Sequence, residues 1–175
     1  MRNIRKIYMG ADHAGFEMKE ELRKFLEMQD YEVIDHGAEE YDEDDDYPDF
    51  ILPVAQDVAL DPETIGIILG GSGQGEAIVA NRVPGVRAVV FNGQYQPSVN
   101  YDDQPDNDRE IPNEIILSRQ HNDANVLSLG ARFLSIEEAK DAVSLWIETE
   151  FSGEDRHIRR IEKIDKLNPL AGFDM

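Results

Sequence analysis

The 175-residue chain contains no cysteine, and this absence excludes several kinds of site. Without thiols there is no disulfide bond, no thiolate metal site and no cysteine nucleophile. Positive charge is also scarce, because 17 Lys and Arg residues face 37 Asp and Glu residues and leave a net charge of −20. Such a surface repels nucleic acid and anionic lipid, so neither is expected as a partner. The acidity is typical either of a highly soluble protein or of one from a salt-rich cytoplasm.

Long apolar runs are missing as well. No stretch approaches the roughly 20 apolar residues of a membrane span, and the N-terminus leads directly into a predicted strand instead of a signal peptide. We therefore expect a cytoplasmic protein. The hydrophobic content of 41% is that of a globular protein. We expect one domain over residues 1–167, followed by a loose tail over residues 168–175.

Short apolar strands alternate with amphipathic segments along the chain. The pattern predicts strands over residues 4–9, 31–37, 64–69, 86–91 and 126–129. It predicts helices over residues 16–26, 50–58, 76–82, 114–119, 135–149 and 156–164. Ser135 and Glu138 have the spacing of a capping box at the start of one helix. This alternation predicts a three-layer, doubly wound, Rossmann-like α/β fold, in which a five-stranded parallel sheet carries helices on both faces.

Two segments lack any such periodicity. Residues 39–46 are almost wholly acidic, which indicates a solvated loop. Residues 92–112 are rich in Asn, Asp, Gln and Pro and predict a long acidic loop. Loops of this length within a compact domain are usually functional or disordered.

The most informative stretch joins the strand ending at Leu69 to the helix beginning at Glu76, and reads Gly70-Gly71-Ser72-Gly73-Gln74-Gly75. Glycines let the backbone approach a ligand closely, and the N–H groups of a first helical turn can hold an anion. A carboxylate beside such donors makes Glu76 a candidate general base. The alternative is an ordinary acidic residue at a helix start. The loop has neither the Lys-Ser/Thr of a Walker loop nor the spacing of a dinucleotide-binding loop.

Further polar residues follow the other strands. Asp12 and His13 follow the first strand, and Arg132 follows the last. Because the carboxyl ends of parallel strands share one edge of the sheet, these residues are expected near the Gly-rich loop. Asp12 could instead be a helix N-cap beside a surface histidine.

A second set of candidate residues occurs in the last third of the chain. Arg156 and Arg160 are four residues apart, so both lie on one helical face and could grip a phosphate. A solvated helix face is the alternative. His121 lies just before the last strand and could be an ordinary loop histidine. The four histidines are scattered, and no metal constellation is apparent.

Taken together, the motifs resemble those of the ribose-5-phosphate isomerase B and galactose-6-phosphate isomerase family. The resemblance extends from Ile7 to Lys166. It is carried, in order, by residues Gly10-Ala11-Asp12-His13-Ala14-Gly15-Phe16, Asp46-Tyr47-Pro48, Gly70-Gly71-Ser72-Gly73-Gln74-Gly75-Glu76, Ala80-Asn81-Arg82, Ser118-Arg119-Gln120-His121-Asn122-Asp123-Ala124-Asn125 and Arg156-His157-Ile158-Arg159-Arg160.

The resemblance implies an aldose–ketose isomerase of a sugar phosphate that works through a cis-enediolate without metal or organic cofactor. The base after the Gly-rich loop is often a cysteine in this family, and a glutamate in the branch that this chain resembles. Glu76 would move a proton between carbons 2 and 1. The N–H groups of residues 71–75 would stabilise the enediolate, and the Ser72 hydroxyl would help to position it. His121, helped by Asp12, would open the furanose ring.

The resemblance also implies how the substrate is held. Asn122 would bind a sugar hydroxyl, while His13 and three arginines would bind the phosphate. The site would lie between the subunits of a homodimer or homotetramer, and the C-terminal helix would reach the partner subunit. The implied binding residues are His13, Tyr47, Gly71, Gly73, Gln74, Gly75, Asn122, Arg132, Arg156 and Arg160.

The expected reaction interconverts ribose 5-phosphate and ribulose 5-phosphate. A hexose 6-phosphate of the galactose or allose type is the alternative, because the insertion at residues 92–112 replaces a short helical link of the family and leads to His121. A non-catalytic sugar-phosphate-binding protein is the alternative from another class. It has no use for a base such as Glu76, which argues against it.

Overall fold

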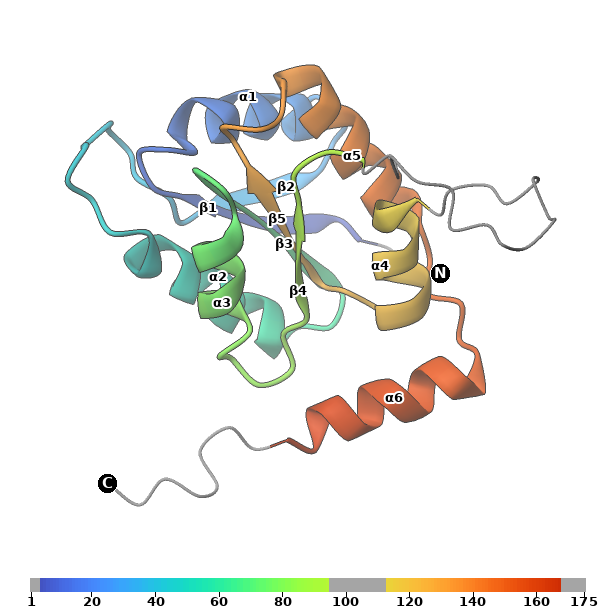
Figure 1. The fold of residues 1–175 in the computed structure, drawn as a ribbon. Helices are drawn as coiled ribbons and strands as arrows, with labels where there is room; N and C mark the ends of the chain where they lie inside the picture. The colour runs from blue at the N-terminus through green and yellow to red at the C-terminus, as the bar shows by residue number, and fades with distance from the viewer. Residues whose placement is uncertain (1–3, 95–112, 168–175) are drawn as a thin grey trace, which may run out of the picture.

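The computed structural model describes residues 4–94 and 113–167 (Figure 1). Most of the loop expected at residues 92–112, and the whole tail at residues 168–175, lie outside the described residues. No helix within the described ranges is long and apolar enough to cross a membrane.

Strands and helices alternate as the sequence predicts. In chain order they are β1 Lys6–Ala11, α1 Phe16–Glu27, β2 Glu32–Asp35, α2 Tyr47–Leu60, β3 Thr64–Gly70, α3 Gln74–Ala80, β4 Ala88–Phe91, α4 Glu114–Asn122, β5 Val126–Gly130, α5 Ile136–Glu148 and α6 Asp155–Asp165. The capping box at the start of α5 is confirmed, because Ser135 and Glu138 satisfy each other's backbone N–H groups.

Two element boundaries differ from the prediction in ways that matter. Strand β1 starts and ends two residues later than expected, so it leads directly into Asp12. Helix α4 continues to Asn122 instead of stopping at Arg119, which places His121 on a helix and not in a loop. The helix ends because Asp123 takes a left-handed conformation, with φ 45°. Glycine is the usual residue at such a helix end, so an aspartate at this position does not mark the end in the sequence.

All five strands are parallel, in the order β2-β1-β3-β5-β4. The central strand β3 is buried along its whole length, as its nearly continuous apolar sequence requires. Helices α1 and α5 pack on one face of the sheet, and α2 and α3 pack on the other (Figure 1). The three-layer architecture expected from the sequence is therefore confirmed.

The sheet order places a topological switch point between β1 and β3. The chain leaves β1 toward β2 on one side, and β3 lies on the other side. The strand register pairs Ala11 of β1 with Leu69 of β3, and Gly70 of β3 with Gly130 of β5. The residues that follow β1, β3 and β5 therefore emerge side by side. Crevices at such switch points are where doubly wound sheets bind ligands.

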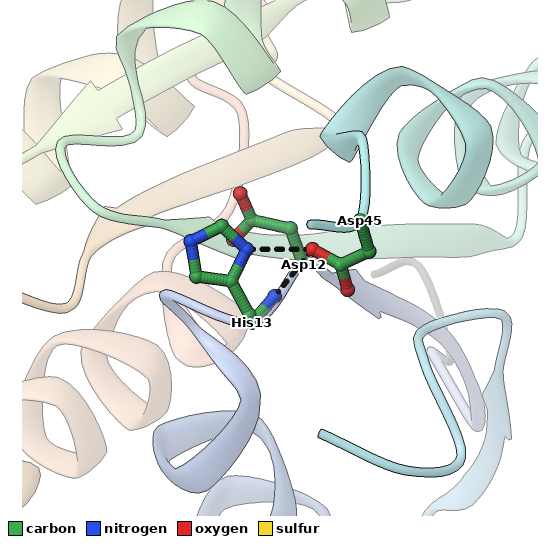
Figure 2. A group of neighbouring side chains, drawn as sticks. All are labelled: Asp12, His13 and Asp45. Atoms are coloured by element: carbon green, nitrogen blue, oxygen red, sulfur yellow. Dashed lines mark hydrogen bonds and ion pairs between the residues drawn. The ribbon is translucent and has the colours of Figure 1, made fainter. Parts of the chain in front are cut away.

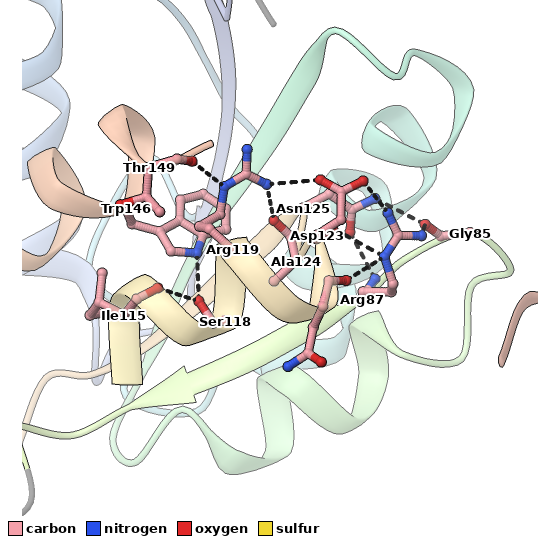
Figure 3. Close-up of polar contacts among 11 residues, drawn as sticks. Gly85, Arg87, Ile115, Ser118, Arg119, Asp123, Ala124, Asn125, Trp146 and Thr149 are labelled. Atoms are coloured by element: carbon pink, nitrogen blue, oxygen red, sulfur yellow. Dashed lines mark hydrogen bonds and ion pairs between the residues drawn. The ribbon is translucent and has the colours of Figure 1, made fainter. Parts of the chain in front are cut away.

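A buried polar network joins α4 to β5 and to the end of α5 (Figure 3). The Arg119 side chain is 3% exposed, donates to the carbonyls of Ala124 and Thr149, and forms an ion pair with Asp123. Its guanidinium also lies 5.1 Å from the centre of the Trp146 ring. This part of the Ser-Arg-x-His segment therefore has a structural role, because it fixes the end of the helix that carries His121.

Arg119→Ala is expected to lower the free energy of unfolding by about 3–5 kcal/mol, because it strips buried polar groups of their charged partner. Urea denaturation followed by circular dichroism measures the change. Arg5→Ala serves as the control, because that side chain is exposed, and it should stay within about 0.5 kcal/mol of the parent. A loss for Arg119→Ala as small as that of the control would contradict the structural role.

Candidate active site

A cavity of about 350 Å³ opens at the carboxyl ends of β1 and β3. It lies at the switch point of the sheet, where the loops after these strands separate. Its walls come from the turn after β1, the start of α2, the Gly-rich loop and the segment after β5. The lining residues are Asp12, His13, Ala14, Tyr47, Gly71, Ser72, Gly75, Glu76, Arg132 and Phe133.

Glu76 is the buried acid of this cavity, with only 4% of its surface exposed. Its carboxylate lies against Gly70, so that a Cβ atom added at Gly70 would overlap the carboxylate. Burial raises the pKa of Glu76 above its usual value, and the negative charge of Asp12 adds to this effect. A raised pKa makes this carboxylate a stronger base than an exposed glutamate, which suits proton abstraction near neutral pH.

Gly70→Ala is expected to push the Glu76 carboxylate out of its place and to lower kcat while the fold is kept. The same substitution should destabilise the parent protein but have little effect in a Glu76→Ala background, where there is no carboxylate to displace. Urea denaturation of the four proteins measures this coupling. Equal destabilisation in both backgrounds would mean that Gly70 does not serve to accommodate Glu76.

The other glycines of the loop are also explained by their neighbours. A Cβ atom at Gly71 would lie 3.2 Å from the Arg132 guanidinium carbon, and one at Gly75 would lie 2.8 Å from the Tyr47 ring. Gly73 has φ 73°, a left-handed conformation that glycine adopts at little cost. The sequence suggested that these glycines clear space for an anion, whereas the structure shows that they also make room for side chains at the site.

His13 is held by an acid from the loop before α2 (Figure 2). Oδ1 of Asp45 accepts from the backbone N–H of His13 at 3.0 Å and lies 2.6 Å from its ring Nδ1. This hydrogen bond is the largest cause that raises the pKa of His13, and the charge of Asp12 adds to it. Arg132 and burial act in the opposite direction.

The same three side chains form a cluster that the sequence did not predict. The Nδ1 or Nε2 atom of His13 and one carboxylate oxygen each of Asp12 and Asp45 all lie within 4.8 Å of one another. Asp45 comes from the acidic run at residues 39–46, so spacing in the sequence could not reveal the cluster. The direct contact between Asp45 and Nδ1 of His13 is that of an ion pair.

A second group of predicted site residues gathers between α4 and α6. The ring centres of His121 and His157 lie 4.2 Å apart, and Nδ1 of His157 lies 3.2 Å from the carbonyl oxygen of Gln120. Burial lowers the pKa of His121, and the nearby His157, Arg156 and Arg160 lower it further. The fold thus brings together the histidine and the two arginines that the sequence places 35 or more residues apart.

Helix α6 projects away from the layered body (Figure 1). Its only residue that is fully buried is His157, which anchors it to α4. The apolar side chains of Ile158, Ile164 and Leu167 are exposed to solvent along the helix and just beyond its end. An amphipathic helix with an uncovered apolar stripe is typical of a surface that a further chain covers.

The predicted site residues therefore fall into two groups within one chain. One group lines the cavity and comprises Asp12, His13, Tyr47, Gly71, Ser72, Gly75, Glu76 and Arg132. Gly73 and Gln74 belong to the same loop without lining the cavity. The other group comprises His121, Asn122, Arg156 and Arg160, none of which lines that cavity.

Three residues at the site were not predicted from the sequence, namely Ala14, Phe133 and Asp45. Phe133 is 62% exposed and lines the cavity beside Arg132. Its position directly after Arg132 was the sequence signal that could have identified Phe133. Asp45 had no distinguishing signal, because it stands among other acids that are exposed. The expectation that residues 39–46 form a solvated loop is wrong at Asp45, whose side chain is only 8% exposed.

The sequence matches the model of the Ribose/Galactose Isomerase family over residues 7–103 and 112–164. The chain belongs to this family. Ribose-5-phosphate isomerase B of Mycobacterium tuberculosis is 39% identical over 158 residues, which cover 90% of this chain and 86% of that protein. The Escherichia coli protein of the same name is 37% identical over 164 residues, covering 94% and 97% of the two chains. The expected family assignment is confirmed.

Solved structures of the family have the same fold. Ribose-5-phosphate isomerase B of Clostridium thermocellum is 40% identical, with a TM-score of 0.76 over 91% of this chain and 95% of that one. The Mycoplasma genitalium enzyme, solved with bound ribulose-5-phosphate, is 32% identical, with a TM-score of 0.77 over 91% and 93% of the two chains. A family member therefore holds a pentose phosphate on this scaffold.

Proposed function

We propose that this protein is an aldose–ketose isomerase that interconverts ribose 5-phosphate and ribulose 5-phosphate. The observation that carries the proposal is the buried carboxylate of Glu76, whose pKa is raised, in a cavity that it shares with Asp12. The relatives named ribose-5-phosphate isomerase B support the choice of a pentose phosphate. A single domain over residues 1–167, working in the cytoplasm, completes the proposal.

In this mechanism Glu76 removes the proton from carbon 2 of the open-chain sugar and returns it to carbon 1. Backbone N–H groups of residues 71–75 stabilise the enediolate oxygen, and the Ser72 hydroxyl positions it. The planar enediolate lets one carboxylate on one face serve both carbons. Because the base and the oxyanion donors belong to the chain, the reaction needs no metal or organic cofactor.

The ring-opening histidine and two of the phosphate-binding arginines come from a partner subunit. His121, with help from the Asp12 of the first subunit, opens the furanose, and Asn122 binds a sugar hydroxyl. Arg156 and Arg160 join His13 and Arg132 around the phosphate. Two features support this division, namely the separation of the two residue groups within one chain and the exposed apolar stripe of α6. The protein would thus be a homodimer or a tetramer of such dimers.

A panel of sugar phosphates tests the substrate. Ribose 5-phosphate, allose 6-phosphate and galactose 6-phosphate are incubated with the enzyme, and the ketose formed is measured. We expect turnover of ribose 5-phosphate. Turnover of a hexose phosphate alone would mean that the segment at residues 92–112 has redirected the pocket. Binding without turnover of any of the three would favour a sugar-phosphate-binding protein.

A further inference from the structure

The acidic run at residues 39–46 contributes one buried carboxylate to the active site. Asp45 is 8% exposed in its side chain, while its neighbours Asp44 and Asp46 are exposed. Tyr41, from the same run, packs edge-on against the ring of His13 with 6.2 Å between ring centres. The loop therefore contacts His13 at two points, through a charge and through an aromatic ring.

The geometry at His13 determines which nitrogen is left for a ligand. Oδ1 of Asp45 accepts from both the backbone N–H and the ring Nδ1 of His13, so the ring is fixed in orientation and Nδ1 keeps its proton. Nε2 is then the atom available to the cavity that His13 lines. When the ring is neutral, Nε2 is an acceptor and repels a phosphate oxygen. When the ring is protonated, Nε2 donates to that oxygen in a charge-assisted hydrogen bond.

The charges around His13 favour the protonated ring. Asp45 faces it from the loop before α2, and Asp12 precedes it in its own turn; both raise its pKa, with the Asp45 hydrogen bond the largest cause. Arg132, from the segment after β5, opposes this effect. Tyr47 from α2 and Glu76 from α3 line the same cavity. On a chain with net charge −20, a cation maintained at this point offsets repulsion of an anionic substrate.

We propose that Asp45 is a positioning residue, which orients His13 and keeps it protonated so that Nε2 donates to the phosphate of the substrate. This inference rests on the proposed isomerase function. It assigns a role to one acid of a run that otherwise has the composition of a solvated loop.

Asp45→Asn tests the charge while keeping the shape, because the amide oxygen still accepts from Nδ1 and from the backbone N–H. Asp45→Ala removes both the charge and the hydrogen bonds. Asp44→Asn is the matched control, since it alters the net charge equally at an exposed neighbour. Thermal unfolding verifies that all three variants are folded.

Kinetics with ribose 5-phosphate are measured from pH 5.5 to pH 8.5. For Asp45→Asn we expect KM at pH 8 to rise about tenfold, the scale of one charge-assisted hydrogen bond, with kcat nearly unchanged. The ratio of this KM to that of the parent should fall toward one at pH 5.5, where His13 is protonated in both proteins. Asp45→Ala should keep a raised KM at every pH, and Asp44→Asn should match the parent.

A readout independent of catalysis separates this inference from the proposed function. The ring of His13 is titrated by NMR in each variant, with its signal assigned by its loss in His13→Gln. Asp45→Asn should lower the pKa of His13, and Asp44→Asn should leave it unchanged. An unchanged titration, or equal KM changes in Asp45→Asn and Asp44→Asn, would overturn the role of Asp45. Failure of the parent to turn over any sugar phosphate would overturn the isomerase proposal, while the titration would still decide the role of Asp45.

Discussion

Glu76→Gln is expected to lower kcat for ribose 5-phosphate by about 10²- to 10⁴-fold, the range that a positioned general base contributes. The amide has nearly the same shape as the carboxylate but cannot accept the proton from carbon 2. KM should change little, because the phosphate is bound by other groups. Steady-state kinetics and binding of ribose 5-phosphate by calorimetry measure the two effects separately.

Glu17→Gln is the control, because it makes the same chemical change at an exposed position in α1. It should retain the activity of the parent. A Glu76→Gln enzyme with more than a tenth of the parental kcat would remove Glu76 from the role of base.

The same substitution is expected to stabilise the fold at neutral pH. The pKa of Glu76 is raised in the folded state, so folded protein holds this proton to a higher pH than unfolded protein does. Ionising Glu76 therefore costs stability as the pH rises above the unfolded value near 4.5, and the cost is complete above the folded pKa. Glu76→Gln escapes this cost. Its gain in Tm over the parent should be largest at pH 8 and should shrink toward pH 4.5, as measured by calorimetry.

Mixing two inactive variants is expected to restore activity. Glu76→Gln damages the cavity group, and His121→Ala damages the group between α4 and α6. If each site combines the two groups from different subunits, a mixed dimer has one intact site and one doubly damaged site. Random exchange makes half of the dimers mixed, so activity should return to about a quarter of the parental value. Assays after subunit exchange in mild denaturant measure the recovery.

The control mixes Glu76→Gln with Asp12→Asn, two changes within the cavity group. Every site of such a mixed dimer carries one of the changes, so no recovery is expected. Differently tagged subunits verify by pull-down that mixed dimers have formed. Absence of recovery in the first mixture, despite mixed dimers, would place the whole site within one subunit.

Much of the fold was predictable because its signals are local. The buried run of β3 and the capping box at Ser135 depend on neighbours in sequence, and both were identified correctly. The end of α4 was missed because Asp123 ends the helix in a left-handed conformation, supported by bonds from its N–H to the carbonyls of Ser118 and Arg119. The buried Arg119 stabilises the same helix end through contacts with Ala124 and Thr149.

The candidate site likewise contains residues that local sequence signals predict and one that they do not. Asp12, the Gly-rich loop and Arg132 each follow a strand, so the parallel sheet alone predicts that they meet at one edge. Asp45 could not be found this way, since nothing local distinguishes it from the acids beside it. Its role depends on where the loop between β2 and α2 returns across the sheet edge to His13.

The sequence by itself determined the alternating α/β architecture and the family, because periodicity and motif order are carried by neighbouring residues. It also predicted Glu76 as the candidate base. Only the tertiary structure decided which side chains share a cavity. It placed the Glu76 carboxylate over Gly70, selected Asp45 from an acidic run, and separated His121 and the α6 arginines from the cavity. These outcomes depend on contacts between segments far apart in the chain, which arise only when the layers pack.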